Sequence, residues 1–262
     1  MAEVKDQEQK QGTESDKDNS SSGPALPSIN ISERGMTDGK PDSLDRRLFM
    51  QFMAFDDCFD LPEIIELLKE EQPQVVLYQD LNNPTGIGML AFCEDPAYIV
   101  DTIHPLLAKE EFEDLEFSQE FTMLGRTYSI GYESDLEDIL LHRPIRRVCD
   151  PETPWCVWYP VRRDGSFERE SREEQRKMLM EHGGIGHAFG KAGYATDIRL
   201  AGHGLNMDDN DFIIGLLGKE LFPLSALVQR MRQTRQTSEF IENMGPFFVG
   251  RAVWQPTPEL KR

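Results

Sequence analysis

The sequence predicts an α+β fold made of two consecutive βαββαβ units. Between residues 47 and 123, apolar runs typical of strands alternate with two amphipathic segments typical of helices. The same order of segments recurs between residues 155 and 250, which indicates an internal duplication. Helices are expected to cover one face of each sheet, so that the two uncovered faces pack on each other.

The first unit begins with an aromatic and apolar run over residues 47–55, typical of a buried strand. Pro62 lies in the first turn of the following helix, where a missing N–H leaves no helical bond unmade. Asparagine, proline and glycine in residues 82–86 predict a turn. The predicted strands span 47–55, 75–78, 87–92 and 116–123, and the predicted helices span 61–69 and 96–107.

The second unit repeats this order, with strands at 155–161, 194–200, 211–217 and 246–250 and helices at 171–189 and 222–235. Each unit has the pattern of a ferredoxin-like fold, and two of them predict a dimeric α+β barrel within one chain. The predicted boundaries are a disordered acidic tail at 1–43, the first unit at 44–140, the second at 141–255 and a short tail at 256–262. The first tail is predicted because it is rich in charged and small residues and poor in aromatic ones.

The helix over 171–189 has the most informative pattern. Ser171 followed by Glu174 is a capping box and predicts where the helix begins. One face holds, at helical spacing, Met178, His182, Ile185 and Phe189. His182 is therefore expected to point inward, either as an ordinary core histidine or as a ligand. The neighbouring glycines at 183, 184 and 186 each weaken a helix by up to about 1 kcal/mol, which favours a group that approaches closely.

The strand over 155–161 places Trp155, Val157, Tyr159 and Val161 on one face and Cys156, Trp158 and Pro160 on the other. Tyr159 is either a structural tyrosine or a reactive one. Around this strand an otherwise acidic chain has a group of arginines, which are Arg143, Arg146, Arg147, Arg162 and Arg163. They are either a solvated rim or a set of carboxylate-binding side chains.

Charge and cysteine spacing exclude several classes of function. The formal net charge of −19 disfavours binding to nucleic acid or to anionic membrane surfaces. The four cysteines have no paired spacing, which disfavours a zinc site, and no apolar run is long enough for an integral membrane segment. Without a recognisable signal peptide, these features predict a cytoplasmic protein.

Several motifs occur in an order that is similar to that of one protein family. They are His142-Arg-Pro, Pro154-Trp-Cys-Val-Trp-Tyr-Pro-Val-Arg162, Glu181-His-Gly183, Asp208-Asp-Asn-Asp-Phe212, Met231-Arg232 with Ser238, and Gly245-Pro-Phe-Phe-Val-Gly-Arg251. By their order and separations, residues 46–254 resemble the chlorite dismutase-like haem proteins. Within that family they look closest to the coproheme decarboxylases of the actinobacterial type.

The resemblance implies a role for each matched position. His182 would be the proximal iron ligand and Tyr159 the redox tyrosine, while His142, 17 residues before Tyr159, would take a proton from hydrogen peroxide. The implied contacts to an iron porphyrin, either coproheme or haem b, are Arg143, Arg162, Arg163, Met178 and Ile185. Two candidates to orient His182 are Gln236 and Glu239, by their place on the last helix.

In such enzymes, hydrogen peroxide drives the decarboxylation of two propionates of coproheme through a tyrosine radical, which gives haem b. Coproheme is then both cofactor and substrate, and the family implies a homo-oligomer, a pentamer. Arg199 falls where chlorite dismutases have a distal arginine, so the conversion of chlorite to chloride and oxygen stays open. A haem-binding protein without catalytic activity is a third alternative.

Overall fold

Residues 29–257 are described by the computed structural model of this chain, whose folded unit begins at Ser32. Antiparallel strands of this unit form a closed ring in the order β7-β11-β4-β5-β3-β6-β8-β9, and β9 pairs back onto β7. The ring strands are β3 (Phe49–Asp56), β4 (Val75–Asp80), β5 (Ile87–Cys93), β6 (Glu116–Arg126), β7 (Trp155–Arg163), β8 (Thr196–Ala201), β9 (Phe212–Gly218) and β11 (Phe248–Trp254). A short strand, β10 (Ile241–Met244), pairs with the end of β7.

Each half of the chain contributes four strands in the same spatial arrangement. The first half is ordered β4-β5-β3-β6, and the second half is ordered β11-β7-β9-β8. In both halves the two central strands are the first and the third in chain order, which are β3 and β5 in the first half and β7 and β9 in the second. The predicted α+β class is confirmed, and every strand predicted in the two units overlaps a strand of the ring.

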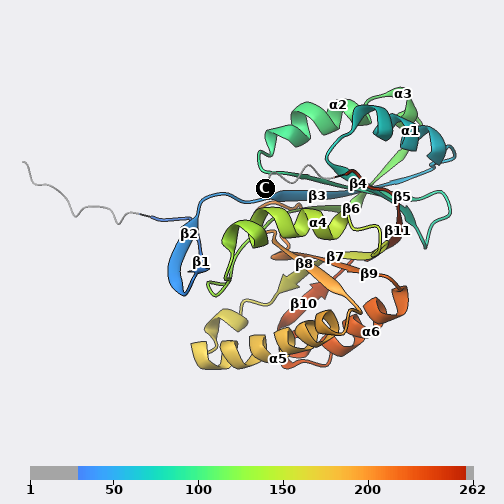
Figure 1. Cartoon of the computed structure of the whole chain (residues 1–262). Helices are drawn as coiled ribbons and strands as arrows, with labels where there is room; N and C mark the ends of the chain where they lie inside the picture. The colour runs from blue at the N-terminus through green and yellow to red at the C-terminus, as the bar shows by residue number, and fades with distance from the viewer. Residues whose placement is uncertain (1–28, 258–262) are drawn as a thin grey trace, which may run out of the picture. The chain divides into compact units, whose positions relative to one another are not determined.

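Helices lie outside the ring on two sides, as Figure 1 shows. One group packs on the outer face of β3, β4 and β5, and the other packs on the outer face of β7, β8 and β9. The first group is α1 (Leu61–Glu71), α2 (His104–Leu107), which follows a π-helical turn at Ile99–Ile103, and α3 (Glu110–Glu113). The second group is α5 (Arg172–Lys191), α6 (Leu221–Met231) and α7 (Arg235–Phe240), with a 3₁₀ turn at Phe167–Arg169 before α5.

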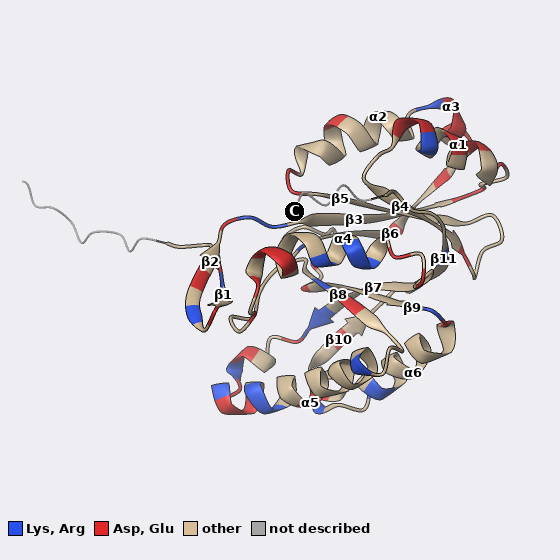
Figure 2. Cartoon of the chain, viewed as in Figure 1, with Lys and Arg blue, Asp and Glu red and all other residues tan. Residues whose placement is uncertain are grey.

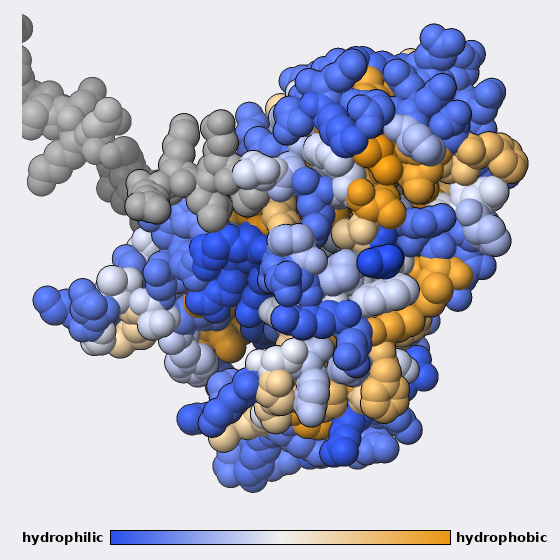
Figure 3. Space-filling view, turned by 45° about the vertical axis from the view of Figure 1, so that its right-hand side comes forward, coloured by the Kyte–Doolittle hydropathy of each residue, from blue (hydrophilic) through white to orange (hydrophobic). Residues whose placement is uncertain are grey.

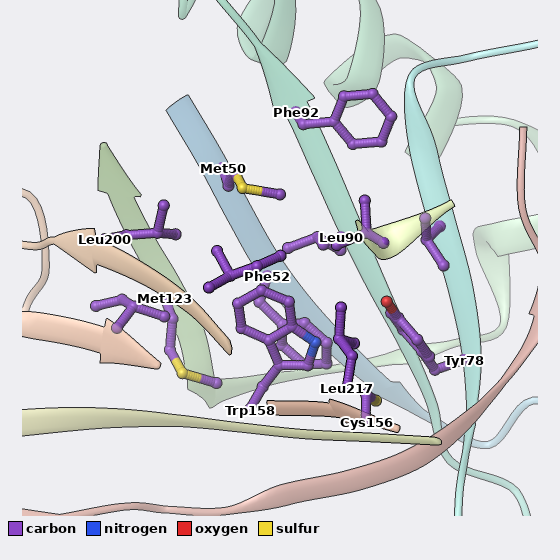
Figure 4. Packing of buried hydrophobic residues seen from close by; sticks show 14 of the residues in the cluster. Met50, Phe52, Tyr78, Leu90, Phe92, Met123, Cys156, Trp158, Leu200 and Leu217 are labelled. Carbon is purple, nitrogen blue, oxygen red and sulfur yellow. The ribbon is translucent and has the colours of Figure 1, made fainter. Parts of the chain in front are cut away.

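The interior of the ring is filled with large apolar side chains (Figure 4). Trp158 is fully buried there and stacks on Phe52 with ring centroids 6.0 Å apart. Space for the indole comes from Gly215 on β9, where an added Cβ would lie 2.4 Å from the Trp158 ring. Because β7 alternates between its two faces, burying Trp158 inside directs Tyr159 to the outer face.

The start of α5 agrees with the capping pattern. Ser171 is the N-cap, and its hydroxyl accepts a hydrogen bond from the N–H of Glu174 at 3.2 Å. The carboxylate of Glu174 pairs with Lys177 and Arg235 instead of returning to the cap. Half of the predicted capping box is therefore formed, and the other half is replaced by a link to α7.

The predicted disordered tail is wrong for its last part. Residues 33–44 form a hairpin of β1 (Glu33–Thr37) and β2 (Lys40–Leu44), which turns at Asp38 and Gly39, both with positive φ. The composition of this segment provides few apolar side chains, so its order comes from contacts with residues 126–137, far away in sequence. Residues 1–28 and 258–262, which include the remaining tail predictions, lie outside the described residues.

Two helical predictions are also corrected. Residues 138–148 form a helix that the sequence interpretation missed, with a π-helical turn at Asp138–His142 that continues into α4 (Arg143–Val148). The predicted helix over 222–235 ends earlier, because Thr234 adopts an extended backbone and caps α7 instead. This break changes which side chains of the segment face α5.

The ring is weakest in backbone pairing between β6 and β8, where one residue pair, Arg126 and Ala201, joins the strands. The side chain of Asn206 compensates for this in part. Its Oδ1 accepts a hydrogen bond from the N–H of Leu124 at 2.8 Å, and its Nδ2 donates to the carbonyl of Leu124 at 2.9 Å. A side-chain amide therefore takes the place of a strand backbone at this joint.

None of the helices in residues 29–257 is long and apolar enough to cross a membrane. The face drawn in Figure 3 is mostly hydrophilic, and hydrophobic side chains are seen on it in smaller patches.

The packing of Trp158 against Gly215 gives a test of the ring interior. We expect Gly215→Ala to destabilise the protein by about 1–3 kcal/mol, because a Cβ 2.4 Å from a buried ring forces the indole or the backbone to move. Gly165→Ala is the matched control, since no heavy atom lies within 4 Å of its added Cβ. Chemical denaturation of the two variants measures the difference, and equal stabilities would contradict this packing.

Candidate functional site

The outer face of β7, β9 and β8 brings two predicted site residues into one row. Tyr159 is paired with Ile214, and Ile214 is paired with Arg199. The two strand spacings place Tyr159 and Arg199 roughly 10 Å apart between their Cα atoms. Arg199 therefore shares the sheet face that carries Tyr159, although its own side chain is partly exposed.

Tyr159 is 5% exposed and lies in the apolar layer between the sheet and the helices. Its ring stacks on Phe247 with centroids 4.5 Å apart. Burial raises the pKa of Tyr159 well above its ordinary value; Asp197 raises it further and Arg232 opposes the rise. Within residues 29–257 its hydroxyl makes no hydrogen bond, so a protonated phenol is left available to a ligand.

His182 lies on the face of α5 that is turned toward the rest of the second unit. Its Nδ1 is 3.3 Å from Oγ1 of Thr234 and 3.5 Å from Oγ1 of Thr237. Burial lowers the pKa of His182, as does the charge of Arg199, against the opposing effect of Asp197 and Glu181. The imidazole is thus kept neutral at neutral pH, which is the form that binds iron.

The partners of His182 differ from those expected. Thr234 is buried, and its hydroxyl also lies 2.8 Å from the carbonyl of Met231. Glu239 pairs with Arg235, and no hydrogen bond in the described part of the chain joins Gln236 or Glu239 to the imidazole. Neither candidate contacts His182, because Thr234 begins the separate helix α7 and it is Thr234 and Thr237 whose hydroxyls lie next to the imidazole.

A cavity of about 300 Å³ lies beside Arg199, in the gap where β6 and β8 separate. Its walls come from the loop after β6, from α4 and from β8. The lining residues are Thr127, Tyr128, Ile130, Tyr132, Glu133, Ile139, Arg143, Pro144, Arg147, Asp197, Ile198 and Arg199. Three arginines therefore line one hollow in a chain whose net charge is −19.

Arg147 is the least neutralised of these arginines. Its guanidinium donates to the carbonyl oxygen of Asp197 and lies 3.8 Å from the carboxylate of the same residue. Arg199 holds that carboxylate more closely, at 3.1 Å. Burial lowers the pKa of Arg147, and the charges of Arg143 and Arg199 lower it further, with Asp197 opposing. An anion in the cavity would relieve this unfavourable burial of charge.

Arg162 and Arg163, predicted to hold propionates, lie at the end of β7 and already have partners. Arg162 pairs with Glu242 at 3.3 Å, and Arg163 pairs with Glu168 at 3.1 Å. The guanidinium of Arg163 also lies 4.2 Å from the ring centroid of Phe167. Arg143, by contrast, lines the cavity while pairing with Asp138. Figure 2 shows the basic residues of α4 beside β8.

His142 is partly buried at the junction of the π-helical turn and α4. No hydrogen bond or ring contact among residues 29–257 joins it to Tyr159 or His182. It directly precedes Arg143, which lines the cavity. Its role as a distal base stays a prediction.

The face of α5 around His182 is as predicted, but its glycines are not crowded by protein. Ile185 packs with the layer that contains Tyr159, while Met178 is buried in a separate cluster with Phe167 and Phe240. An added Cβ at Gly183 or Gly184 would meet no atom within 4 Å. The protein itself therefore does not require these two glycines, which are exposed on other faces of α5.

Sequence reasoning missed the threonines beside His182, as well as Arg147 and Tyr128 in the cavity wall. Arg147 belonged to the arginine group noted in the sequence, but nothing there separated it from Arg146, which points to Asp138. Tyr128 follows β6 in a loop without helical or strand periodicity. Tyr128 lines the cavity because β6 and β8 separate next to the pair of Arg126 and Ala201.

The second half of the chain, which contains these residues, also matches a known protein family. Residues 141–253, which contain Tyr159, His182 and Arg199, match the protein family described as Chlorite dismutase. A search of curated proteins finds no match.

Solved structures share the fold. A mutant of chlorite dismutase from Candidatus Nitrospira defluvii has 14% sequence identity and a TM-score of 0.61, covering 82% of this chain and 93% of its own. A haem-binding protein from Thermus thermophilus has 16% identity and a TM-score of 0.61, covering 80% of this chain and 92% of its own. The chain thus has a chlorite dismutase-like fold in which the family match falls on the half that carries the site.

The lowered pKa of His182 predicts a pH dependence of stability. In the unfolded chain this histidine binds a proton near its ordinary pKa of 6.5, whereas the folded protein resists protonation. The contribution is therefore fully present above about pH 6.5 and is lost as the pH falls below that value. We expect the wild type to lose more unfolding free energy than His182→Gln between pH 7.5 and 5.5. Equal losses in denaturant titrations would contradict the burial of a neutral imidazole.

Proposed function

We propose that this protein, whose residues 141–253 match the chlorite dismutase family, binds an iron porphyrin and decarboxylates ferric coproheme to haem b with hydrogen peroxide. The observation that supports it best is the position of Tyr159 on the sheet face covered by α5, the helix that carries His182. A haem-binding protein and a chlorite dismutase among the structures with this fold agree with an iron porphyrin as the cofactor.

The residues present fit such a group. His182 is neutral, has its Nδ1 next to two threonine hydroxyls, and in the described chain leaves Nε2 without a hydrogen bond. This arrangement resembles metal-binding histidines in general, whose second nitrogen is held by a neighbouring polar group. His182 is accordingly the proposed iron ligand.

The arginine-lined cavity supports a ligand with several carboxylates. Its volume of about 300 Å³ is at the small end of ligand sites, so it suits one substituted edge of a porphyrin. Arg143, Arg147 and Arg199 provide fork-shaped donors that match carboxylates. Coproheme has four propionates and haem b has two, so the cavity favours coproheme. Arg162 and Arg163 stay second candidates for this role, since each would first have to leave its acidic partner.

Tyr159 and His142 have separate proposed tasks. The bound iron porphyrin supplies the oxidation by hydrogen peroxide. The phenol of Tyr159, held protonated by burial, loses its proton and one electron together and then takes a hydrogen atom from the propionate carbon. His142 accepts a proton from peroxide. For each propionate, two electrons leave with the hydrogen and the carboxylate, carbon dioxide is released, and one peroxide is reduced to two waters.

The larger organisation predicted from the sequence agrees with this proposal. The strand order repeats between the two halves of the chain, as expected of two ferredoxin-like units that form a dimeric α+β barrel. We propose a cytoplasmic homo-oligomer, and a pentamer is the form that the resemblance implies.

Chlorite dismutation is the second candidate, and Arg199 favours it. This arginine shares a row with Tyr159 and its charge acts on His182, as expected of a cation facing the reacting side of a cofactor. Its pairing with Asp197 at 3.1 Å leaves the side chain 53% exposed and able to turn toward a ligand. The third alternative, a haem-binding protein without activity, requires that neither reaction occurs.

We expect the purified protein to bind ferric coproheme and, with two equivalents of peroxide, to lose two carboxylates as measured by mass spectrometry. Tyr159→Phe should retain the Soret spectrum and lose at least about 100-fold in rate, because the phenolic hydrogen is gone. Tyr194→Phe, an exposed tyrosine, is the control. Intact coproheme after peroxide would contradict the decarboxylase. Oxygen release from chlorite that is lost in Arg199→Gln would support the second candidate instead.

The cavity predicts selectivity for carboxylates. We expect Arg147→Gln to bind coproheme about tenfold more weakly, since one charge-assisted contact is removed, and to bind the iron coproporphyrin tetramethyl ester like the wild type. Arg146→Gln is a matched control on the same helix, because Arg146 pairs with Asp138 and does not line the cavity. Titrations that follow the Soret band measure both ligands. Equal weakening by the two substitutions would remove the cavity from carboxylate recognition.

A further inference from the structure

The hairpin of β1 and β2 runs beside the segment that leads from β6 to α4 (Figure 1). Its strongest link is the carboxylate of Glu33, whose side chain is 14% exposed. Oε1 of Glu33 accepts a hydrogen bond from Nη1 of Arg126 at 3.0 Å, and Oε2 accepts from the N–H of Ser129 at 2.9 Å. One carboxylate thus holds the last residue of β6 and the loop that follows it.

Backbone contacts continue this link along β1. The N–H of Arg34 donates to the hydroxyl of Ser129 at 3.2 Å, and that hydroxyl donates to the carbonyl of Arg34 at 2.6 Å. The N–H of Met36 donates to the carbonyl of Glu133 at 2.7 Å. Gly35 allows the close approach, because a Cβ there would lie 2.7 Å from Leu136 and 2.8 Å from the carbonyl of Glu133.

The segment held in this way is the outer wall of the cavity. Its residues Thr127, Tyr128, Ile130, Tyr132 and Glu133 all line the hollow. The carboxylate of Glu133 accepts the N–H groups of Ile130, Gly131 and Tyr132 at 2.8–2.9 Å, so the tip of the loop moves as one body.

The base of this loop is anchored to the fold, because Thr127 exchanges backbone and hydroxyl hydrogen bonds with Leu48 and Leu140, and Tyr128 packs on Phe212. Beyond Tyr128, the loop has little other support. Residues 127–134 belong to no helix or strand, and Ile130 and Tyr132 are 56% and 78% exposed. The ring gives little help, because β6 and β8 share one residue pair next to the loop. The position of residues 129–134 therefore depends on their contacts with the hairpin.

We infer that the β1–β2 hairpin is a strap that fixes residues 129–134 in the outer wall of the cavity, and that Glu33 is the positioning residue of this strap. The hairpin does not touch the ligand. It sets how often the wall opens and hence how long a bound porphyrin stays, a consequence that rests on the proposed function. The position of the wall itself does not rest on it.

Glu33→Gln tests the strap with little change in shape. In the protein without ligand, amide hydrogen exchange of residues 129–134 should become about tenfold faster, since the charge-assisted hold on Arg126 and Ser129 is lost. Exchange in β7 and α5 should not change. Asp42→Asn is the matched control, because this carboxylate binds the hydroxyl of Thr37 and the N–H of Ser43 within the hairpin. Ser129→Ala, which removes the hydroxyl from the other side of the contact, should act like Glu33→Gln.

Haem dissociation measures the consequence for the ligand. Transfer of haem from the full-length protein to apomyoglobin should be about tenfold faster for Glu33→Gln than for the wild type or Asp42→Asn, with the same Soret spectrum before transfer. Unchanged loop exchange in both Glu33→Gln and Ser129→Ala would overturn the strap. Faster exchange with unchanged haem release would overturn its role in retention. A wild type that takes up no haem would refute the proposed function and the retention role, and exchange would still decide the strap.

Discussion

Strand β7 is paired along both edges, with β9 on one side and with β11 and β10 on the other. These pairings fix its register, and register decides which side chains lie inside the ring. Trp158 is then held in the interior against Gly215, and its neighbour Tyr159 is placed on the outer face beneath the helices. A slip of one residue would turn Tyr159 into the interior and Trp158 to the outer face. The stability of the core and the position of the candidate site therefore depend on the same strand pairing.

The candidate site has an uncharged part, which contains Tyr159 and His182, and a charged part, which is the arginine-lined cavity. Around Tyr159 and His182 the surroundings are mostly apolar, and burial keeps the phenol protonated and the imidazole neutral. Next to them, Arg143, Arg147 and Arg199 line a hollow with two acidic residues, Asp197 and Glu133. Glu133 is occupied by backbone N–H groups of its own loop, Asp138 pairs with Arg143, and Asp197 is shared by Arg147 and Arg199. Arg147, whose ion pair is the longest of these, is the group best suited to contact an added carboxylate.

Sequence patterns predicted those parts of the fold that depend on local periodicity. The strand at 155–161 and the helix at 171–189 were predicted with the correct faces, because alternation and helical spacing depend on neighbouring residues. The hairpin at 33–44 could not be predicted in this way, since Glu33 and Gly35 are ordered by residues near 129 and 136. The partners of His182 were missed because one extended residue, Thr234, turns α7 relative to α6. The cavity could not be predicted, because it depends on the separation of β6 and β8, two strands that are far apart in sequence.

The joint between β6 and β8 has a consequence of its own. Elsewhere in the ring, neighbouring strands are joined by ladders of backbone groups, which every amino acid except proline provides equally. At this joint, the ladder is reduced to the pair Arg126 and Ala201, and the amide side chain of Asn206 provides the further hydrogen bonds to Leu124. The strength of this one seam can therefore be tuned by ordinary substitution without altering the topology. Since the cavity lies where the same two strands separate, a substitution at Asn206 acts next to the cavity and leaves the other strand pairings in place.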